Sequence, residues 1–308
     1  MAEDRVALID RLGDIIMSKK RLNIDWSSPE EIGDLDPVLR RFWNYLRDKG
    51  FRDSTIGPYV GAIRRYLEYT KVEKPSIEDA NKYRQTLFDR NLARSTINNY
   101  SFAIANYHKM IGGSVKLPFL KRNDEIPYYF DQDDILRIFS TCGNIKHLAM
   151  LKTLFYGSLR ASELCNLDDS DVDLKGLILR VRNGKGGKDG MVLISNDCAC
   201  ILKKYLAMRP PLMIDGHQPL FYTDYGRRWD RRDVHRMFVT YKKRAGIEKQ
   251  GGVHVFARHS SATILVANGC DIRIVKDLLR HEDIRTTLRY AHVSDKMKRD
   301  RYEQCLVL

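Results

Sequence analysis

The fold of the C-terminal half of the chain is decided by residues 253–292, which read VHVFARHSSATILVANGCDIRIVKDLLRHEDIRTTLRYAH. The spacing of apolar residues predicts two helices in this stretch. Asn268-Gly269 should end the first helix, whose apolar residues are Ala262, Ile264, Leu265 and Val266. Asp271 should cap the second helix, whose buried stripe comprises Ile272, Val275, Leu278 and Leu279.

Polar side chains stand at the ends of these two helices. His254, Arg258 and His259 precede the apolar part of the first helix, His281 follows the second, and Tyr290 comes shortly after it. Packing of the apolar stripes would leave imidazoles, a guanidinium and a phenol free to converge. Such a set suits chemistry on a phosphodiester.

The composition indicates a two-domain protein with a polyanionic partner. The chain has 308 residues, 43% of them hydrophobic, which is enough for two packed cores. Its formal net charge of +13 favours nucleic acid as the partner. No apolar run is long enough for a membrane span, and no signal-peptide core is present. The six cysteines show no metal-binding spacing, so we expect reduced thiols in a cytoplasmic protein.

Residues 36–112 contain an internal repeat. The sequence STIGPYVGAIRRY at 54–66 recurs as STINNYSFAIANY at 95–107. In each copy a Ser or Thr could N-cap a helix whose Ile, Ala and Tyr residues share one face. Because a further helix is expected before each copy, the repeat predicts a domain of four helices.

The rest of the sequence predicts a mixed domain that follows a linker. Gly and Pro residues with Lys121-Arg122 are typical of a linker, and a β-hairpin is expected around Asn183-Gly184. The other segments show helical spacing. The fold class is therefore mainly α with a small β-hairpin or sheet (α+β). The predicted parts are an N-terminal helical extension (1–33), a four-helix DNA-binding domain (34–113), a linker (114–127), a catalytic domain (128–295) and a C-terminal tail (296–308).

Four motifs in this order resemble the tyrosine recombinases, the family of phage-type integrases and Xer-type site-specific recombinases. They are LRASEL at 159–164, GKGGK at 184–188, RHSSAT at 258–263, and LRH at 279–281 followed by TTLRY at 286–290. The N-terminal repeat looks like the core-binding domain of that family. The resemblance implies site-specific cutting and rejoining of DNA through a 3′-phosphotyrosyl intermediate, with the duplex held between the two domains.

The resemblance also implies roles for particular residues. Tyr290 would be the nucleophile, and Arg160 and Arg258 would bind the oxygens of the scissile phosphate. Lys185 would protonate the departing 5′ oxygen, while His281 and His254 would assist as donor and acid/base. Glu163 would either orient Arg160 or form a simple salt bridge within its helix. Residues expected to contact DNA are Arg52, Arg64, Arg65, Arg94, Lys121, Arg122, Lys188 and Arg280.

The sequence departs from the family pattern at three places. Three residues separate His254 from Arg258, where the family usually has two. The turn before Arg160 lacks one residue of the common Thr-Gly-Leu-Arg form, and Arg280 stands where a Gly usually precedes the histidine. These differences leave the role of His254 open and suggest an added phosphate contact by Arg280.

Two other functions are compatible with the residues. A type IB topoisomerase-like enzyme would use similar chemistry as a monomer, and a non-catalytic module would only bind DNA. The tail beyond Tyr290 favours recombination, in which subunits would dock as a dimer on each site and a tetramer in the synaptic complex. We expect double-stranded DNA and further copies of this chain as partners, no membrane association, no metal, no cofactor, and a nucleoid-associated location.

Overall fold

The computed structural model describes residues 36–121, 128–182, 189–291 and Tyr302. The chain divides into two compact units, Met1–Asn123 and Asp124–Leu308. Lys185, Lys188 and Arg122, together with the expected N-terminal helix and the hairpin turn, lie outside the described residues. Within the described residues, no helix is both long and apolar enough to cross a bilayer.

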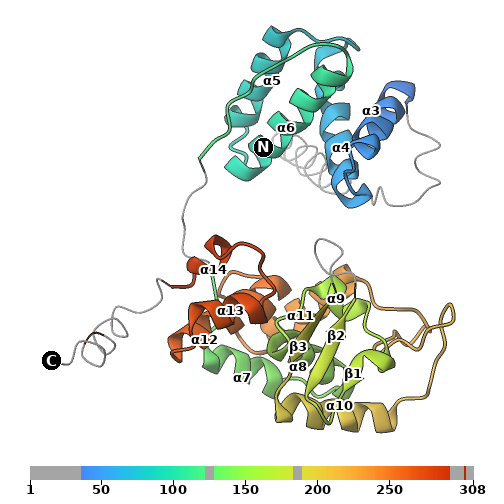
Figure 1. The fold of residues 1–308 in the computed structure, drawn as a ribbon, viewed down its shortest axis with the longest axis vertical. Helices are drawn as coiled ribbons and strands as arrows, with labels where there is room; N and C mark the ends of the chain where they lie inside the picture. The colour runs from blue at the N-terminus through green and yellow to red at the C-terminus, as the bar shows by residue number, and fades with distance from the viewer. Residues whose placement is uncertain (1–35, 122–127, 183–188, 292–301, 303–308) are drawn as a thin grey trace, which may run out of the picture. The chain divides into compact units, whose positions relative to one another are not determined.

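The first unit contains four described helices, as the repeat predicts (Figure 1). They are α3 (Pro37–Asp48), α4 (Asp53–Thr70), α5 (Ile77–Asp89) and α6 (Arg94–Met110). Their apolar faces enclose one core, in which repeat-related residues such as Ile63 and Ile104 are fully buried. The two copies of the repeat therefore pack their equivalent faces inward, and α4 lies against α6.

The predicted Ser or Thr N-caps of α4 and α6 are wrong. The N-cap residues are Arg52 and Ala93, and neither makes a side-chain capping bond. The carbonyl of Arg52 accepts from the N–H of Thr55 and that of Ala93 from the N–H of Thr96. Arg52 and Ala93 have non-helical backbone angles, so each helix begins directly after them, one residue before the serine. Each serine therefore lies inside the first turn of its helix.

The second unit surrounds a small antiparallel sheet with helices (Figure 1). The strands, in the order β1-β2-β3, are β1 (Val172–Asp173), β2 (Ile178–Val181) and β3 (Gly190–Leu193). The helices are α7 (Gln132–Ser140), α8 (Ile145–Tyr156), α9 (Ala161–Cys165), α10 (Asn196–Met208), α11 (Arg231–Arg244), α12 (Ser261–Ala267), α13 (Ile272–Leu278) and α14 (Arg285–Leu288), with the 3-10 turn η1 (Asp169–Asp171) and the π turn η2 (Val255–Ser260).

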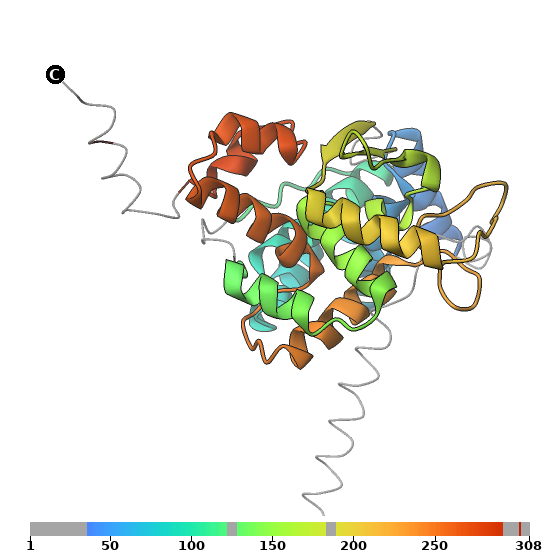
Figure 2. The same ribbon diagram turned by 90° about the horizontal axis from the view of Figure 1, so that it is seen from below.

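One face of the sheet belongs to the core of this unit. Leu179 pairs with Val192 across the ladder and both side chains are buried, whereas Met191 and Leu193 are exposed. This alternation is the period of two expected for a half-buried strand. Helices α8 and α10 pack along each other and supply much of the remaining core (Figures 1 and 2). The observed fold confirms the predicted mainly helical class with a small sheet.

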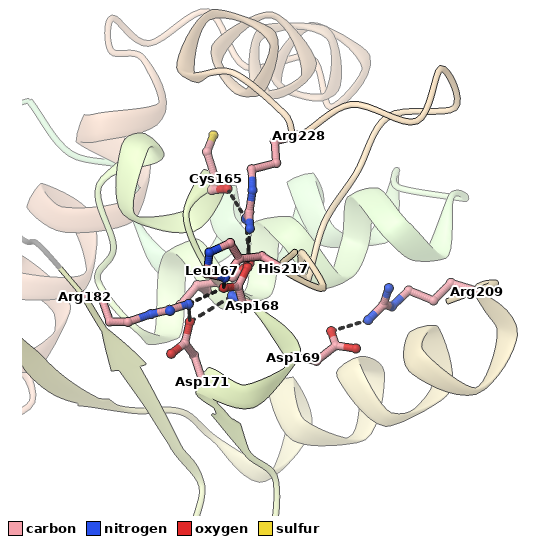
Figure 3. A network of polar contacts seen from close by, with 9 residues as sticks. All are labelled: Cys165, Leu167, Asp168, Asp169, Asp171, Arg182, Arg209, His217 and Arg228. Atoms are coloured by element: carbon pink, nitrogen blue, oxygen red, sulfur yellow. Dashed lines mark hydrogen bonds and ion pairs between the residues drawn. The ribbon is translucent and has the colours of Figure 1, made fainter. Parts of the chain in front are cut away.

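A buried ionic cluster ties the end of β2 to the segments around it (Figure 3). Asp168, 4% exposed, accepts hydrogen bonds from Arg182 at 2.5 Å and from Arg228. Arg182 also donates to Asp171 at 2.6 Å. Arg228 in addition donates to the carbonyl of Cys165 at the end of α9. The cluster therefore links β2, η1 and α9, the helix that begins next to Arg160.

Candidate active site

Arg160 is fixed at the N-terminus of α9 by a carboxylate of its own helix. Its backbone N–H donates to Oε2 of Glu163 at 2.9 Å, and its Nη1 donates to Oε1 at 2.6 Å. Ser158, two residues earlier, has φ 46°, and this left-handed residue turns the chain sharply between α8 and α9. Main chain and guanidinium of Arg160 are thus held by the same side chain.

Arg258 lies at the centre of the site and is only 2% exposed. Its Nη1 donates to the carbonyl of Ser158 at 2.6 Å, and its Nη2 donates to the carbonyl of Leu279 at 2.5 Å. Burial and the nearby charge of Arg160 lower the pKa of Arg258 to about 10. The guanidinium therefore stays charged at neutral pH and joins the turn before α9 to the end of α13.

Glu163 connects Arg160 to a second arginine. Its carboxylate is buried, and Oε2 accepts from Nη2 of Arg280 at 2.6 Å. Burial alone would raise the pKa of Glu163, but Arg280 and the N–H groups of Arg160 hold it below its ordinary value. Glu163 consequently remains ionised and neutralises part of a strongly positive site.

The additional residue between His254 and Arg258 is accommodated by the π turn η2. A π turn takes one residue more than an α turn, so residues four apart keep about the same face as residues three apart in an α-helix. Part of the His254 side chain reaches solvent. The atoms packed around its ring displace water, and this desolvation, followed by the charge of Arg258, lowers its pKa. The imidazole is therefore neutral at physiological pH and able to accept a proton.

Tyr290 belongs to a small core with residues of α12 and α13 and is 3% exposed. The ring of His259 stands edge-on between Tyr290 and His254, with ring centroids 5.7 Å and 5.0 Å away. Burial raises the pKa of Tyr290, while the cations of Arg289 and Arg258 oppose this. Arg258 is thus close enough for its charge to act on the phenol as well as on Arg160.

His259 was not singled out as a site residue by the sequence, although it lies in a motif that the resemblance uses. Its Nδ1 is buried without a hydrogen-bond partner among the described residues. Burial, followed by the neighbouring charge of His254, lowers its pKa to about 4. Ring-edge contacts with two other site residues indicate that His259 fills the space between them as a neutral imidazole.

His281 is oriented by a threonine of the segment that follows it. Its Nδ1 lies 2.8 Å from the hydroxyl of Thr287, which is fully buried. The structure therefore brings together Arg160, Arg258, Glu163 and Tyr290, with His254, His259 and His281 around them. Within the described ranges, no group of three or more His, Cys, Asp or Glu residues is arranged to hold a metal ion.

The remaining predicted DNA contacts lie in the first unit. Arg52, Arg94 and Lys121 are exposed, whereas Arg64 and Arg65 are half-buried. Arg65 donates to the hydroxyl of Tyr100 at 2.9 Å. The three exposed side chains could therefore contact DNA without any change in the packing of this unit.

Comparisons with known proteins identify the family of the chain. The model of the phage integrase family matches residues 128–297. The chain is 30% identical to tyrosine recombinase XerA of Pyrococcus horikoshii over 91% of this chain and 96% of the relative. It is 28% identical to tyrosine recombinase XerD of Oceanobacillus iheyensis over 87% and 98% of the two chains.

A solved structure shares the fold at lower identity. The integrase of transposon Tn1549, bound to transposon right-end DNA, superposes with a TM-score of 0.68 and 20% identity, covering 88% of this chain and 99% of the integrase. The family match spans more than half of the chain and the relatives align over nearly their whole length. The chain therefore belongs to the phage integrase family and is a tyrosine recombinase.

Proposed function

We propose that the chain cuts and rejoins duplex DNA at specific sites with Tyr290 as the nucleophile. The observation that supports this most directly is the position of Arg258, whose charge acts on both Arg160 and Tyr290. Two guanidinium groups beside one phenol form a site for a phosphodiester that the phenol attacks.

In the first step, the hydroxyl oxygen of Tyr290 attacks phosphorus and the bond to the 5′ oxygen breaks. A free phenol has a pKa of about 10, so only ~0.1% is ionised at neutral pH, and burial lowers that fraction further. His254, neutral and near Arg258, would act as a general acid or base in this step. Lys185 would donate a proton to the leaving 5′ oxygen.

Arg160 and Arg258 would neutralise the charge that grows on the non-bridging oxygens, and His281 would donate to one of them. Each such contact contributes about 10²–10³ in rate in comparable enzymes. The phosphotyrosyl bond keeps the energy of the phosphodiester, so rejoining by a 5′ hydroxyl of a partner duplex needs no ATP. Glu163 supports the first arginine through its two hydrogen bonds.

The two compact units suggest how DNA is held. We propose that residues 34–113 bind one face of the duplex through Arg52, Arg64, Arg65, Arg94 and Lys121, while residues 128–295 bind the scissile phosphate. Arg122 and Lys188 would add backbone contacts. We further propose a dimer on each site, a tetramer in the synaptic complex, docking by the tail 296–308, and a location on the nucleoid.

Covalent trapping tests this function. The target would first be selected from a random duplex pool and then nicked a few nucleotides to the 3′ side of the cleavage point, so that the short fragment released with the new 5′ hydroxyl diffuses away. The wild-type chain should form a protein–DNA adduct that resists detergent, and mass spectrometry should find the DNA on Tyr290. Tyr290→Phe should form none and still bind DNA.

Tyr225→Phe provides a matched control, because Tyr225 is 86% exposed and lies outside the proposed site and the proposed docking tail. This variant should form the adduct at the wild-type rate. An adduct on Tyr290→Phe would show that the nucleophile is assigned wrongly. Relaxation of supercoiled plasmid without recombinant products would favour a topoisomerase-like activity instead.

A further inference from the structure

Arg280 has two features that a glycine at this position would avoid. It follows α13 with φ 53°, in the left-handed region that residues other than glycine enter at a cost. Its Nη1 is buried without a hydrogen-bond partner in the described part of the chain. Both the backbone angle and the unsatisfied donor cost free energy. They indicate that another atom of the guanidinium makes a favourable contact that offsets this cost.

That contact is the carboxylate of Glu163. Nη2 of Arg280 and Oε2 of Glu163 are 2.6 Å apart, and their side chains are 17% and 4% exposed. The same oxygen accepts the backbone N–H of Arg160, and the other oxygen accepts its Nη1. One buried carboxylate is therefore held between two guanidinium groups. Arg160 stands at the N-terminus of α9, and Arg280 follows the C-terminus of α13.

The stem of Arg280 passes close to the start of β3. A Cβ placed on Gly190 would lie only 2.7 Å from Cδ of Arg280. A glycine at this position of the strand thus leaves room for the arginine to reach Glu163.

We propose that Arg280 is a positioning residue: by holding Glu163, it sets the orientation in which Arg160 binds the scissile phosphate. This inference rests on the proposed function. It differs from the direct phosphate contact that the sequence suggested for Arg280, and the affinity measurements below distinguish the two roles. Without Arg280, Glu163 would be free to rotate with Arg160 and to take up a proton as the pH falls.

Arg280→Gly is the informative variant, since glycine accepts φ 53° and only the side chain is lost. We expect at least a tenfold fall in the single-turnover rate of adduct formation at saturating nicked DNA. The fall should grow as the pH is lowered, because Arg280 is the largest of the influences that hold the pKa of Glu163 below its ordinary value. Affinity for DNA and its salt dependence should stay at the wild-type values, and Arg280→Lys should recover part of the rate.

A double-mutant cycle tests whether Arg280 acts through Glu163. Glu163→Gln should lower the rate, and adding Arg280→Gly to it should cause no further loss. Arg273→Ala serves as the control, because Arg273 lies on α13 and pairs in solvent with Asp271, at 80% side-chain exposure. Its rate should stay within twofold of wild type. Thermal unfolding of each variant checks that it is folded.

Three results would overturn the inference. A wild-type rate in Arg280→Gly, or a full further loss in the double variant, would show that Arg280 does not act through Glu163. Lower affinity with a salt slope reduced by about one, and an unchanged rate at saturation, would show a direct phosphate contact. By contrast, the absence of any adduct with the wild-type chain would contradict the proposed function itself.

Discussion

The guanidinium of Arg258 is a buried charge. Its hydrogen-bond partners explain how the fold accommodates this charge. Both terminal nitrogens donate to main-chain carbonyls, those of Ser158 and Leu279, and neither is neutralised by a carboxylate in those contacts. A buried charge of this kind is expensive unless a counter-charge arrives. The nearby charge of Glu163 compensates part of this positive charge, and the remainder would attract a phosphate.

His259 illustrates a half-buried base whose titration should affect stability. Burial lowers its pKa to about 4, below the value of about 6.5 for the unfolded chain. Since the unfolded state binds the proton more tightly, this histidine contributes stability above pH 6.5 that is lost as the pH falls towards 4. The loss at pH 5 is at most about 2 kcal/mol, and smaller to the extent that the ring reaches solvent.

His259→Gln should therefore flatten the decline of the unfolding temperature of the second unit between pH 7.5 and pH 5. The measurement is calorimetry of the full chain at several pH values. His235→Gln is the control, because His235 is exposed. An equally steep decline in His259→Gln and wild type would mean that other groups govern the acid sensitivity.

At the scale of elements, irregular backbone builds the site. The π turn η2 keeps His254 on the face of Arg258 despite an additional residue, and a left-handed Ser158 brings α9 back towards Arg258. π turns in proteins are frequent at functional sites. The two departures from the family pattern near His254 and Arg160 thus coincide with irregular backbone, a π turn in one case and a left-handed residue in the other.

The cluster around Asp168 should be a main support of β2 and α9. Asp168→Asn leaves Arg182 and Arg228 without their shared carboxylate, and removing one partner of a buried pair usually costs several kcal/mol. Because these arginines are 35% and 28% exposed, we expect a smaller loss, about 2 kcal/mol in the unfolding free energy of the second unit.

Denaturant unfolding monitored by circular dichroism measures this loss. Asp283→Asn is the matched control, since Asp283 pairs with Arg285 at the exposed surface and its removal should leave stability unchanged. If both variants unfold at the same denaturant concentration as wild type, the cluster does not stabilise this part of the fold.

At the scale of the whole molecule, two separate cores predict two unfolding transitions. Trp43 is 1% exposed in the core of the first unit, and Phe238 is fully buried in the core of the second. Trp43→Ala should destabilise the first unit by about 3–5 kcal/mol and leave the transition of the second unit in place.

Phe238→Ala should have the converse effect, and differential scanning calorimetry separates the two. A single transition that both substitutions shift equally would show that the chain unfolds as one cooperative body.

The sequence by itself determined the helices, the mainly helical fold class and the family. These follow from local patterns: the repeat at 54–66 and 95–107, the caps at Asp271 and Asn268-Gly269, and the order of the four motifs. Helix N-termini were less predictable, because extended Arg52 and Ala93 start their helices before the serines that could have capped them.

Only the tertiary structure decided which polar groups meet. Arg258 and Ser158 are 100 residues apart in the chain, and Arg280 and Glu163 are 117 apart. No local pattern reports such pairs, because their contact depends on how α9, η2 and α13 pack around a shared core. The same packing buries His259 and Tyr290, and burial, which shifts their pKa values, is a property of the folded chain alone.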